Sequence, residues 1–179
     1  MTYIFLLCYN KNIMQWELIT DIILISSIAI LAVFAVLGLI QWISRKSLKK
    51  VDKQLLWMPL PLILMVATYL ICDKVLPKFF DFMPTRPNGS GEPSFPSTHA
   101  LVVATIFFVV TLALPKYIKS KPARIFLELI MAVLIGLVCT GRVMSNMHSI
   151  VDVVGALVFA LIYSEIYRQI IKKRKNSHE

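Results

Sequence analysis

Long, uninterrupted apolar blocks constrain this chain more than any other feature. A helix needs about 20 consecutive apolar residues to cross the hydrocarbon core of a bilayer. Hydrophobic residues make up 58% of the 179 positions and come in runs, which excludes an ordinary soluble domain. We therefore predict a single all-α domain over residues 1–179, a polytopic transmembrane helical bundle. Its five predicted spans cover residues 18–43, 55–76, 97–114, 123–140 and 150–171.

The first predicted span is longer than a bilayer requires. As a helix, residues 18–43 would measure about 39 Å, so this span must tilt or protrude. Met1 to Tyr9 is also apolar, but it is too short to cross and lacks the basic start and cleavage site of a signal peptide. We expect this segment to lie at the membrane interface.

The basic residues indicate the orientation. A net charge of +9 can point to nucleic acid, but here the Lys and Arg residues stand between apolar blocks, which excludes nucleic acid as a partner. Short cytoplasmic loops collect Lys and Arg, so we predict an outer N-terminus and a cytoplasmic C-terminus. Fourteen of the nineteen basic residues would then lie inside: Arg45, Lys46, Lys49, Lys50, Lys53, Lys116, Lys119, Lys121, Arg124, Arg168, Lys172, Lys173, Arg174 and Lys175.

The segment "SFPSTHA" places polar residues directly before the third span. Ser97 follows a proline and precedes a long helix, so capping that helix is its simplest role. A helix N-terminus also exposes backbone N–H groups that bind anions. Ser97 and the Thr98 amide can therefore donate to a phosphate, and His99 in the first turn lies within reach of the same anion.

A second polar pair begins the fifth span. His148 and Asp152 are four residues apart, so they face the same side of a helix that begins near His148. A carboxylate on one imidazole nitrogen fixes the tautomer and makes the other nitrogen more nucleophilic. Asp152 stands in an apolar span, where an unpaired carboxylate is expensive, so His148 is its expected partner. The alternative is a pair that only anchors the end of the helix.

Cations gather on the same predicted face. Lys78 and Arg86 belong to a loop rich in Pro and Gly, expected to form a rigid, irregular lid, and Arg142 precedes His148. Each of these cations alone would be read as a solvated or headgroup-contacting residue. Together with two histidines they form the parts of a phosphoryl-transfer site. The carboxylates of this face lack a recurring ligand spacing, so we predict no metal site.

Three ordered motifs carry a resemblance to a known family. Lys78 is followed by Arg86-Pro87, then comes Pro96 to His99, and then Arg142 to Asp152 with His148 between them. In this order and on outer loops, the motifs resemble those of the type 2 phosphatidic acid phosphatase superfamily of membrane lipid phosphatases. The resemblance runs from Lys78 to Asp152, and the span pattern extends it to the C-terminus.

The resemblance implies a role for each matching residue. His148 would attack phosphorus to form a phosphohistidine, with Asp152 orienting it. His99 would protonate the leaving oxygen and then activate water. The implied phosphoryl-binding residues are Lys78, Arg86, Ser97, Thr98 through its amide, and Arg142.

The sequence departs from the family pattern in four ways. Seven residues, rather than six, separate Lys78 from Arg86. Gly141 replaces the family serine, which removes one hydroxyl donor. Thr98 replaces a glycine, which is tolerable if its backbone N–H is what binds. Five spans replace the usual six, as a four-helix catalytic core plus one N-terminal span.

The implied function is a lipid phosphatase that needs neither metal nor cofactor and opens at the outer face of a bacterial plasma membrane. The resemblance suggests undecaprenyl diphosphate, phosphatidylglycerol phosphate, phosphatidate or lipid A phosphate as substrate, and the small chain favours undecaprenyl diphosphate. Two alternatives stay open: a lipid phosphotransferase that passes the phosphoryl group to an alcohol, and a non-catalytic lipid-binding membrane protein. The sequence leaves the oligomeric state open.

Overall fold

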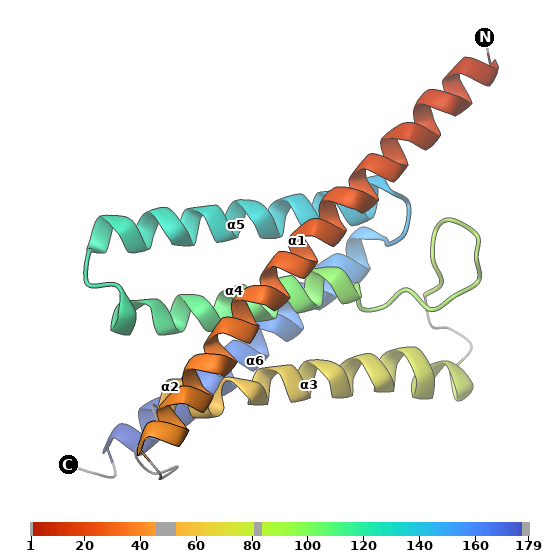
Figure 1. The fold of residues 1–179 in the computed structure, drawn as a ribbon. Coiled ribbons are helices and arrows are strands. Elements are labelled where there is room, and N and C mark those ends of the chain that lie inside the picture. The colour runs from red at the N-terminus through yellow and green to blue at the C-terminus, as the bar shows by residue number, and fades with distance from the viewer. Residues whose placement is uncertain (1, 46–52, 81–83, 177–179) are drawn as a thin grey trace.

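The computed structural model describes residues 2–45, 53–80 and 84–176, and within these ranges every regular element is helical (Figure 1). The all-α prediction is confirmed. Helix α3 continues into a wide π-helical turn over Ile71–Val75 and a 3-10 turn over Leu76–Lys78. The helices are α1 (Thr2–Arg45), α2 (Lys53–Trp57), α3 (Pro59–Leu70), α4 (Thr98–Tyr117), α5 (Lys121–Met144) and α6 (Ile150–Asn176).

Five segments are long and apolar enough to cross a membrane, as predicted. They are Ile13–Ser44, Leu55–Lys78, Thr98–Tyr117, Lys121–Met144 and Ile150–Lys172. Four predicted spans fall entirely within these bounds, and the third begins one residue early. The chain before the first span differs from the expectation, because α1 runs unbroken from Thr2. Residues up to Tyr9 thus belong to the same helix as the first span, ahead of its first residue Ile13, and their place at the membrane interface stays a prediction.

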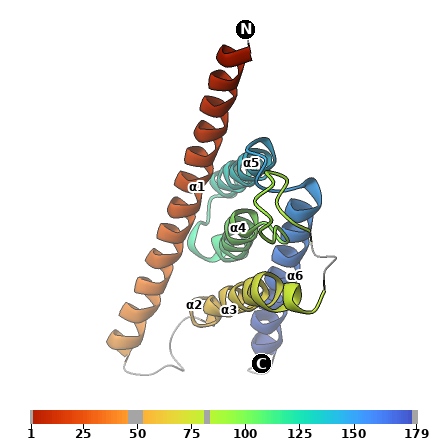
Figure 2. The ribbon, with the colours of Figure 1, turned by 90° about the vertical axis from the view of Figure 1, so that its right-hand side faces the viewer.

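Helix α4 is the central helix of the bundle. It passes between the other long helices in Figure 2, and 61% of its spanning window is buried, against 11% for α1 and for α5. Val103 and Phe107 of α4 pack with Ile23 of α1 and Val138 of α5 in one core cluster. The exposed large side chains of the outer helices are mostly aliphatic, which suits contact with lipid tails.

Helices α4 and α6 meet through small residues. Ala100 and Ala104 of α4 are buried against Ala156 and Ala160 of α6. Small side chains let two backbones approach closely, which is the usual basis of helix association in a membrane. This close contact fixes the beginning of α4 relative to the beginning of α6, and both predicted histidine motifs stand there.

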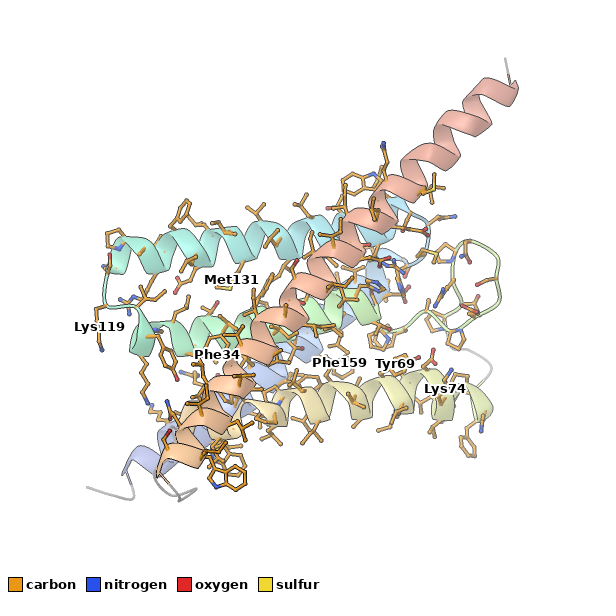
Figure 3. All side chains as sticks on the ribbon, viewed as in Figure 1. Phe34, Tyr69, Lys74, Lys119, Met131 and Phe159 are labelled. Atoms are coloured by element: carbon orange, nitrogen blue, oxygen red, sulfur yellow. The ribbon has the colours of Figure 1, made fainter. Side chains whose placement is uncertain are left out.

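The two ends of the bundle differ in character. The first turns of α1, the loop before α4 and the loop between α5 and α6 lie at one end, and the α4–α5 turn and the C-terminal helix end lie at the other (Figure 1). Figure 3 labels Lys119 at this second end and Lys74 near the first. The predicted site residues and the first turns of α1 therefore share one end, as the predicted topology requires. Which end faces the cytoplasm stays a prediction.

Candidate active site

A tight turn after α5 sets the position of His148. Asn146 adopts the left-handed conformation with φ of 58°, which asparagine tolerates better than most residues. The amide of Asn146 donates to the Val143 carbonyl at 3.0 Å, and that of Met147 donates to the Arg142 carbonyl at 3.3 Å. These two hydrogen bonds end the helix. The His148 amide also donates to the Arg142 carbonyl, at 3.2 Å. Arg142 and His148 are thus tied through the backbone.

The imidazole of His148 is buried and has a defined tautomer. Only 5% of the residue is exposed, and its Nδ1 lies 2.9 Å from the Ser94 carbonyl oxygen. A carbonyl can only accept, so Nδ1 carries the proton and Nε2 keeps a free lone pair. Burial, and then the nearby Arg142 charge, lower the pKa of His148 from 6.5 to about 4. The ring is therefore neutral and nucleophilic at neutral pH.

Asp152 differs from the expectation. Its Oδ2 lies 3.9 Å from His148 Nδ1, too far for a hydrogen bond, because the Ser94 carbonyl occupies that donor. Helix α6 begins at Ile150, after His148, and Asp152 Oδ2 accepts instead from the Ser149 amide at 2.7 Å. Asp152 is fully buried, and its Oδ1 has no hydrogen-bond partner among the described residues. The carboxylate acts on His148 through its charge and not through a hydrogen bond.

The loop that supplies the Ser94 carbonyl is more regular than the irregular lid that we expected. Between Pro84 and Ser94 the chain folds back on itself as a hairpin: the Ser94 amide donates to the Pro84 carbonyl at 2.9 Å, and the Arg86 amide donates to the Glu92 carbonyl at 2.9 Å. Glu92 also pairs with the Arg86 guanidinium at 3.0 Å. Gly89 supplies a positive φ of 80° at the tip.

The base of this hairpin is fixed against α6 by an aromatic ring. Phe95 lies so close to Gly155 that a Cβ at that glycine would come within 2.2 Å of the ring. The ring also meets Phe159 edge-on, with 6.2 Å between centroids. A glycine is needed at this point of α6, and Phe95 in turn holds the neighbouring Ser94 carbonyl over His148.

Ser97 occupies the N-cap position of α4 but does not act as a cap. Its hydroxyl makes no capping bond, and the atom is buried without a partner among the described residues. Its amide donates to the Asp152 carbonyl at 3.1 Å, which joins the start of α4 to α6. The first turn of α4 therefore keeps its amide donors uncapped by this side chain, as an anion site requires.

His99 has a partner that the motif analysis missed. Its Nε2 lies 2.8 Å from Oδ1 of Asp21, which belongs to α1, 78 positions earlier. The carboxylate accepts, so Nε2 donates, and the described residues give Nδ1 no hydrogen-bond partner. One signal was present in the sequence: Asp21 is the single charged residue between positions 18 and 43, and an ionisable residue inside an apolar span indicates a functional site.

One cavity of about 230 Å³ brings most of the predicted site residues together. Arg142 is 5% exposed, and its Nε is buried without a hydrogen-bond partner among the described residues, so the guanidinium can still bind an anion. Ser97, Asp152 and the exposed Lys78 do not line the cavity. Lys78 ends the 3-10 turn that follows the π-helical turn, and Asp73 within the π-helical turn is the residue of this segment that lines the cavity. The predicted lining residues are Arg86, Thr98, His99, Arg142 and His148, and the others include Tyr69, Asp73, Ser94 and Phe95.

The chemistry available in this cavity is that of phosphoryl transfer. A neutral imidazole offers a lone pair at His148 Nε2, and a second imidazole, His99, can carry a proton to and from an oxygen. Arg86, Arg142 and the helix N-terminus supply positive charge for phosphoryl oxygens. The part of the chain that the structure describes contains no group of three or more His, Cys, Asp or Glu side chains placed to hold a metal ion.

Comparisons with known proteins agree with this reading. A family model described as the PAP2 superfamily matches residues 67–176. Among solved structures, the fold is similar to the "first transmembrane PAP2 type phosphatidylglycerolphosphate phosphatase from Bacillus subtilis", with a TM-score of 0.63 and 21% sequence identity over 92% of this chain and 83% of that chain. At this identity the likeness bears on the fold alone. No curated protein matches the sequence significantly.

Proposed function

This chain belongs to the PAP2 superfamily, whose model matches more than half of its length, and on this premise we propose a phosphohistidine mechanism for it. It is a membrane-embedded phosphoric ester hydrolase, and the resemblance that its motifs carry is confirmed. The proposal is that it removes a terminal phosphate from a lipid headgroup at the outer membrane face. The observation that carries the proposal is the cavity that His99, His148 and the buried Arg142 share.

In the first step, His148 Nε2 attacks phosphorus, an N–P bond forms, and the bond from phosphorus to the lipid oxygen breaks. His99 gives its proton to the departing oxygen. In the second step, His99 takes a proton from water, the water oxygen bonds to phosphorus, and the N–P bond breaks to release inorganic phosphate. Both guanidinium groups and the amides of α4 hold the phosphoryl oxygens throughout. Since these groups neutralise the phosphoryl charge, the reaction needs no metal ion.

Two features support a lipid as the substrate. The cavity lies at one end of the bundle beside helices whose outer faces are aliphatic, so a phosphate can enter while its tails stay in the membrane. The Bacillus subtilis protein of similar fold is a phosphatidylglycerolphosphate phosphatase by its title. We propose undecaprenyl diphosphate as the first substrate to test and phosphatidylglycerol phosphate as the second. A bacterial plasma membrane with an outer active site fits both.

The test is phosphate release from purified protein in detergent, with a chelator present, over undecaprenyl diphosphate, phosphatidylglycerol phosphate, phosphatidate and lipid A phosphate. His148→Ala should lower the rate at least about 1,000-fold, because it removes the nucleophile. His178→Ala is the control, since it removes the remaining histidine of the sequence. Release without added alcohol separates a phosphatase from a phosphotransferase. Failure on every lipid, or full activity of His148→Ala, contradicts the proposal.

A further inference from the structure

Helix α1 lies outside the segment that the PAP2 model matches, yet it contacts the cavity residues. The match begins at residue 67, and α1 ends at Arg45. Its Asp21 holds Nε2 of His99 at 2.8 Å, and the carboxylates of Glu17 and Asp21 lie near enough to Arg142 to interact electrostatically. This helix therefore contributes to the site in a way that the family motifs do not describe.

Gly141 explains how α1 comes so close. A Cβ at this position would lie 2.6 Å from Cγ2 of Thr20 and 3.2 Å from the Trp16 ring, both on α1. A contact of 2.6 Å does not occur between carbon atoms and one of 3.2 Å is tight, so a side chain here would force the Thr20 side chain or α1 itself to shift. Thr20, the residue directly before Asp21, is fully buried by this contact. The glycine that replaces the family serine is thus what seats α1 against the site.

We propose that Asp21 is a positioning residue for His99 and that Gly141 is the position that allows it to act. This inference rests on the proposed function. The carboxylate fixes the Nε2–H tautomer of His99, leaves Nδ1 toward the substrate oxygen, and stabilises the positive charge of the ring while it holds the proton for the leaving group. Each of the two cavity histidines is then oriented by a fixed acceptor, the Ser94 carbonyl for His148 and Asp21 for His99.

If the Asp21 contact were only structural, Asp21→Asn would lower the unfolding temperature and leave kcat unchanged. The proposal predicts the opposite. The Asp21 side chain is 54% exposed, and ion pairs at such positions add little to stability. Asp21→Asn should therefore leave the thermal unfolding temperature nearly unchanged. It should lower kcat by roughly 10- to 100-fold, part of what a general acid contributes, with a smaller effect on KM. Asp21→Glu should restore part of the loss.

The leaving group gives the sharpest readout. A lipid alkoxide needs a proton to depart, whereas a nitrophenolate departs without one. The loss that Asp21→Asn causes in the rate of phosphohistidine formation, measured in a single turnover, should therefore be large with a phosphatidate or phosphatidylglycerol phosphate substrate and less than about threefold with p-nitrophenyl phosphate. The control is Glu165→Gln, which removes a carboxylate that pairs with Arg168 at 2.6 Å in α6, far from the cavity residues in sequence. It should change neither rate.

Gly141→Ser tests the second half of the proposal. By displacing α1 it should lower kcat with the same dependence on the leaving group, and combining it with Asp21→Asn should give little further loss. Gly136→Ser is the matched control, because nothing lies within 4 Å of a Cβ at that position of the same helix. If the site only lacks a hydroxyl donor, Gly141→Ser will instead raise the activity, and the proposal is then wrong.

A measurement without turnover separates this inference from the proposed function. The sequence has three histidines, so their side-chain nitrogens can be resolved by ¹⁵N NMR of the full chain in detergent, with His99→Gln assigning the signal. The wild type should show His99 protonated at Nε2, and Asp21→Asn should lose that preference. An unchanged His99 signal, or a wild-type kcat for Asp21→Asn on a lipid that the wild type hydrolyses, overturns the inference. Absence of hydrolysis by the wild type counts against the proposed function, and the NMR result still decides the role of Asp21.

Discussion

Gly155→Ala should disturb the active site, although Gly155 does not line the cavity. The added Cβ would lie 2.2 Å from Cε2 of Phe95, and carbon atoms pack at about 3.5 Å or more, so the ring must move by about 1.3 Å. Phe159 closes one side of the ring, which limits where it can go. The neighbouring Ser94 carbonyl, which holds His148 Nδ1, moves with it.

The size of the effect follows from this displacement. Overpacking costs about 1–3 kcal/mol, and replacing a helical glycine with alanine returns about 1 kcal/mol, so the stability should fall by at most about 2 kcal/mol. A shift of about 1 Å at a reacting group can cost 100-fold in rate. We therefore expect kcat to fall by roughly 10- to 100-fold while the protein stays folded.

The assay compares initial rates of phosphate release with the thermal unfolding temperature of the same detergent preparation. Gly136→Ala is the control, since nothing lies within 4 Å of its Cβ, and it should keep the wild-type kcat and unfold at the same or a higher temperature. Adding Phe95→Leu to Gly155→Ala should relieve the contact and recover part of the rate. A Gly155→Ala protein with wild-type kcat would refute the idea that Phe95 transmits the position of α6 to His148.

Two further predictions concern charge. The pKa of His148 is about 4 in the folded protein and 6.5 in the unfolded chain, so the unfolded chain binds a proton at a higher pH. The unfolding temperature should therefore decrease as the pH is lowered from 6.5 to 4. His148→Gln should make this decrease smaller. The ring itself stays neutral down to about pH 4, so an acid loss of activity well above that pH should come from another group, such as His99, and should be the same in variants that leave His99 intact. Arg142→Gln should lower kcat/KM by roughly 10- to 100-fold, since it removes charge-assisted hydrogen bonds to phosphate. The control Arg124→Gln, at the opposite end of α5, should keep the wild-type value. Equal kcat/KM values for the two variants would exclude a phosphate-binding role for Arg142.

The spans and the common location of the two histidines followed from the sequence, because both depend on local pattern. Apolar runs have a length that a membrane sets, and His99 and His148 begin the third and fifth spans, which enter the bilayer from the same side. Spacing alone cannot show which acceptor each ring meets. The partner of His148 is a backbone carbonyl, which no residue type marks, and the partner of His99 is 78 positions away.

Backbone geometry also bears on two other expectations, the cap at Ser97 and the place of Lys78. Ser97 has the sequence context of a cap, but its hydroxyl does not bond the first turn of α4. Lys78 stands near the family position, but the π-helical turn over Ile71–Val75 changes which residues face the cavity. An irregular helical turn has no reliable sequence signature, so a motif that depends on counting residues across it is easily misplaced. A role for Lys78 in binding stays a prediction.

The base and the tip of the hairpin from Pro84 to Ser94 differ in how tightly they are held. Backbone bonds close its base beside His148, whereas at its tip nothing lies within 4 Å of a Cβ at Gly89 or Gly91, and the Asn88 side-chain amide reaches Met147 at 3.3 Å. Under the proposed function, the exposed side chain of Ser90 can therefore change beside the cavity while the backbone bonds at the base of the hairpin keep His148 in place. A lineage built on this arrangement can change its choice of lipid by drift in one short loop while its chemistry stays the same.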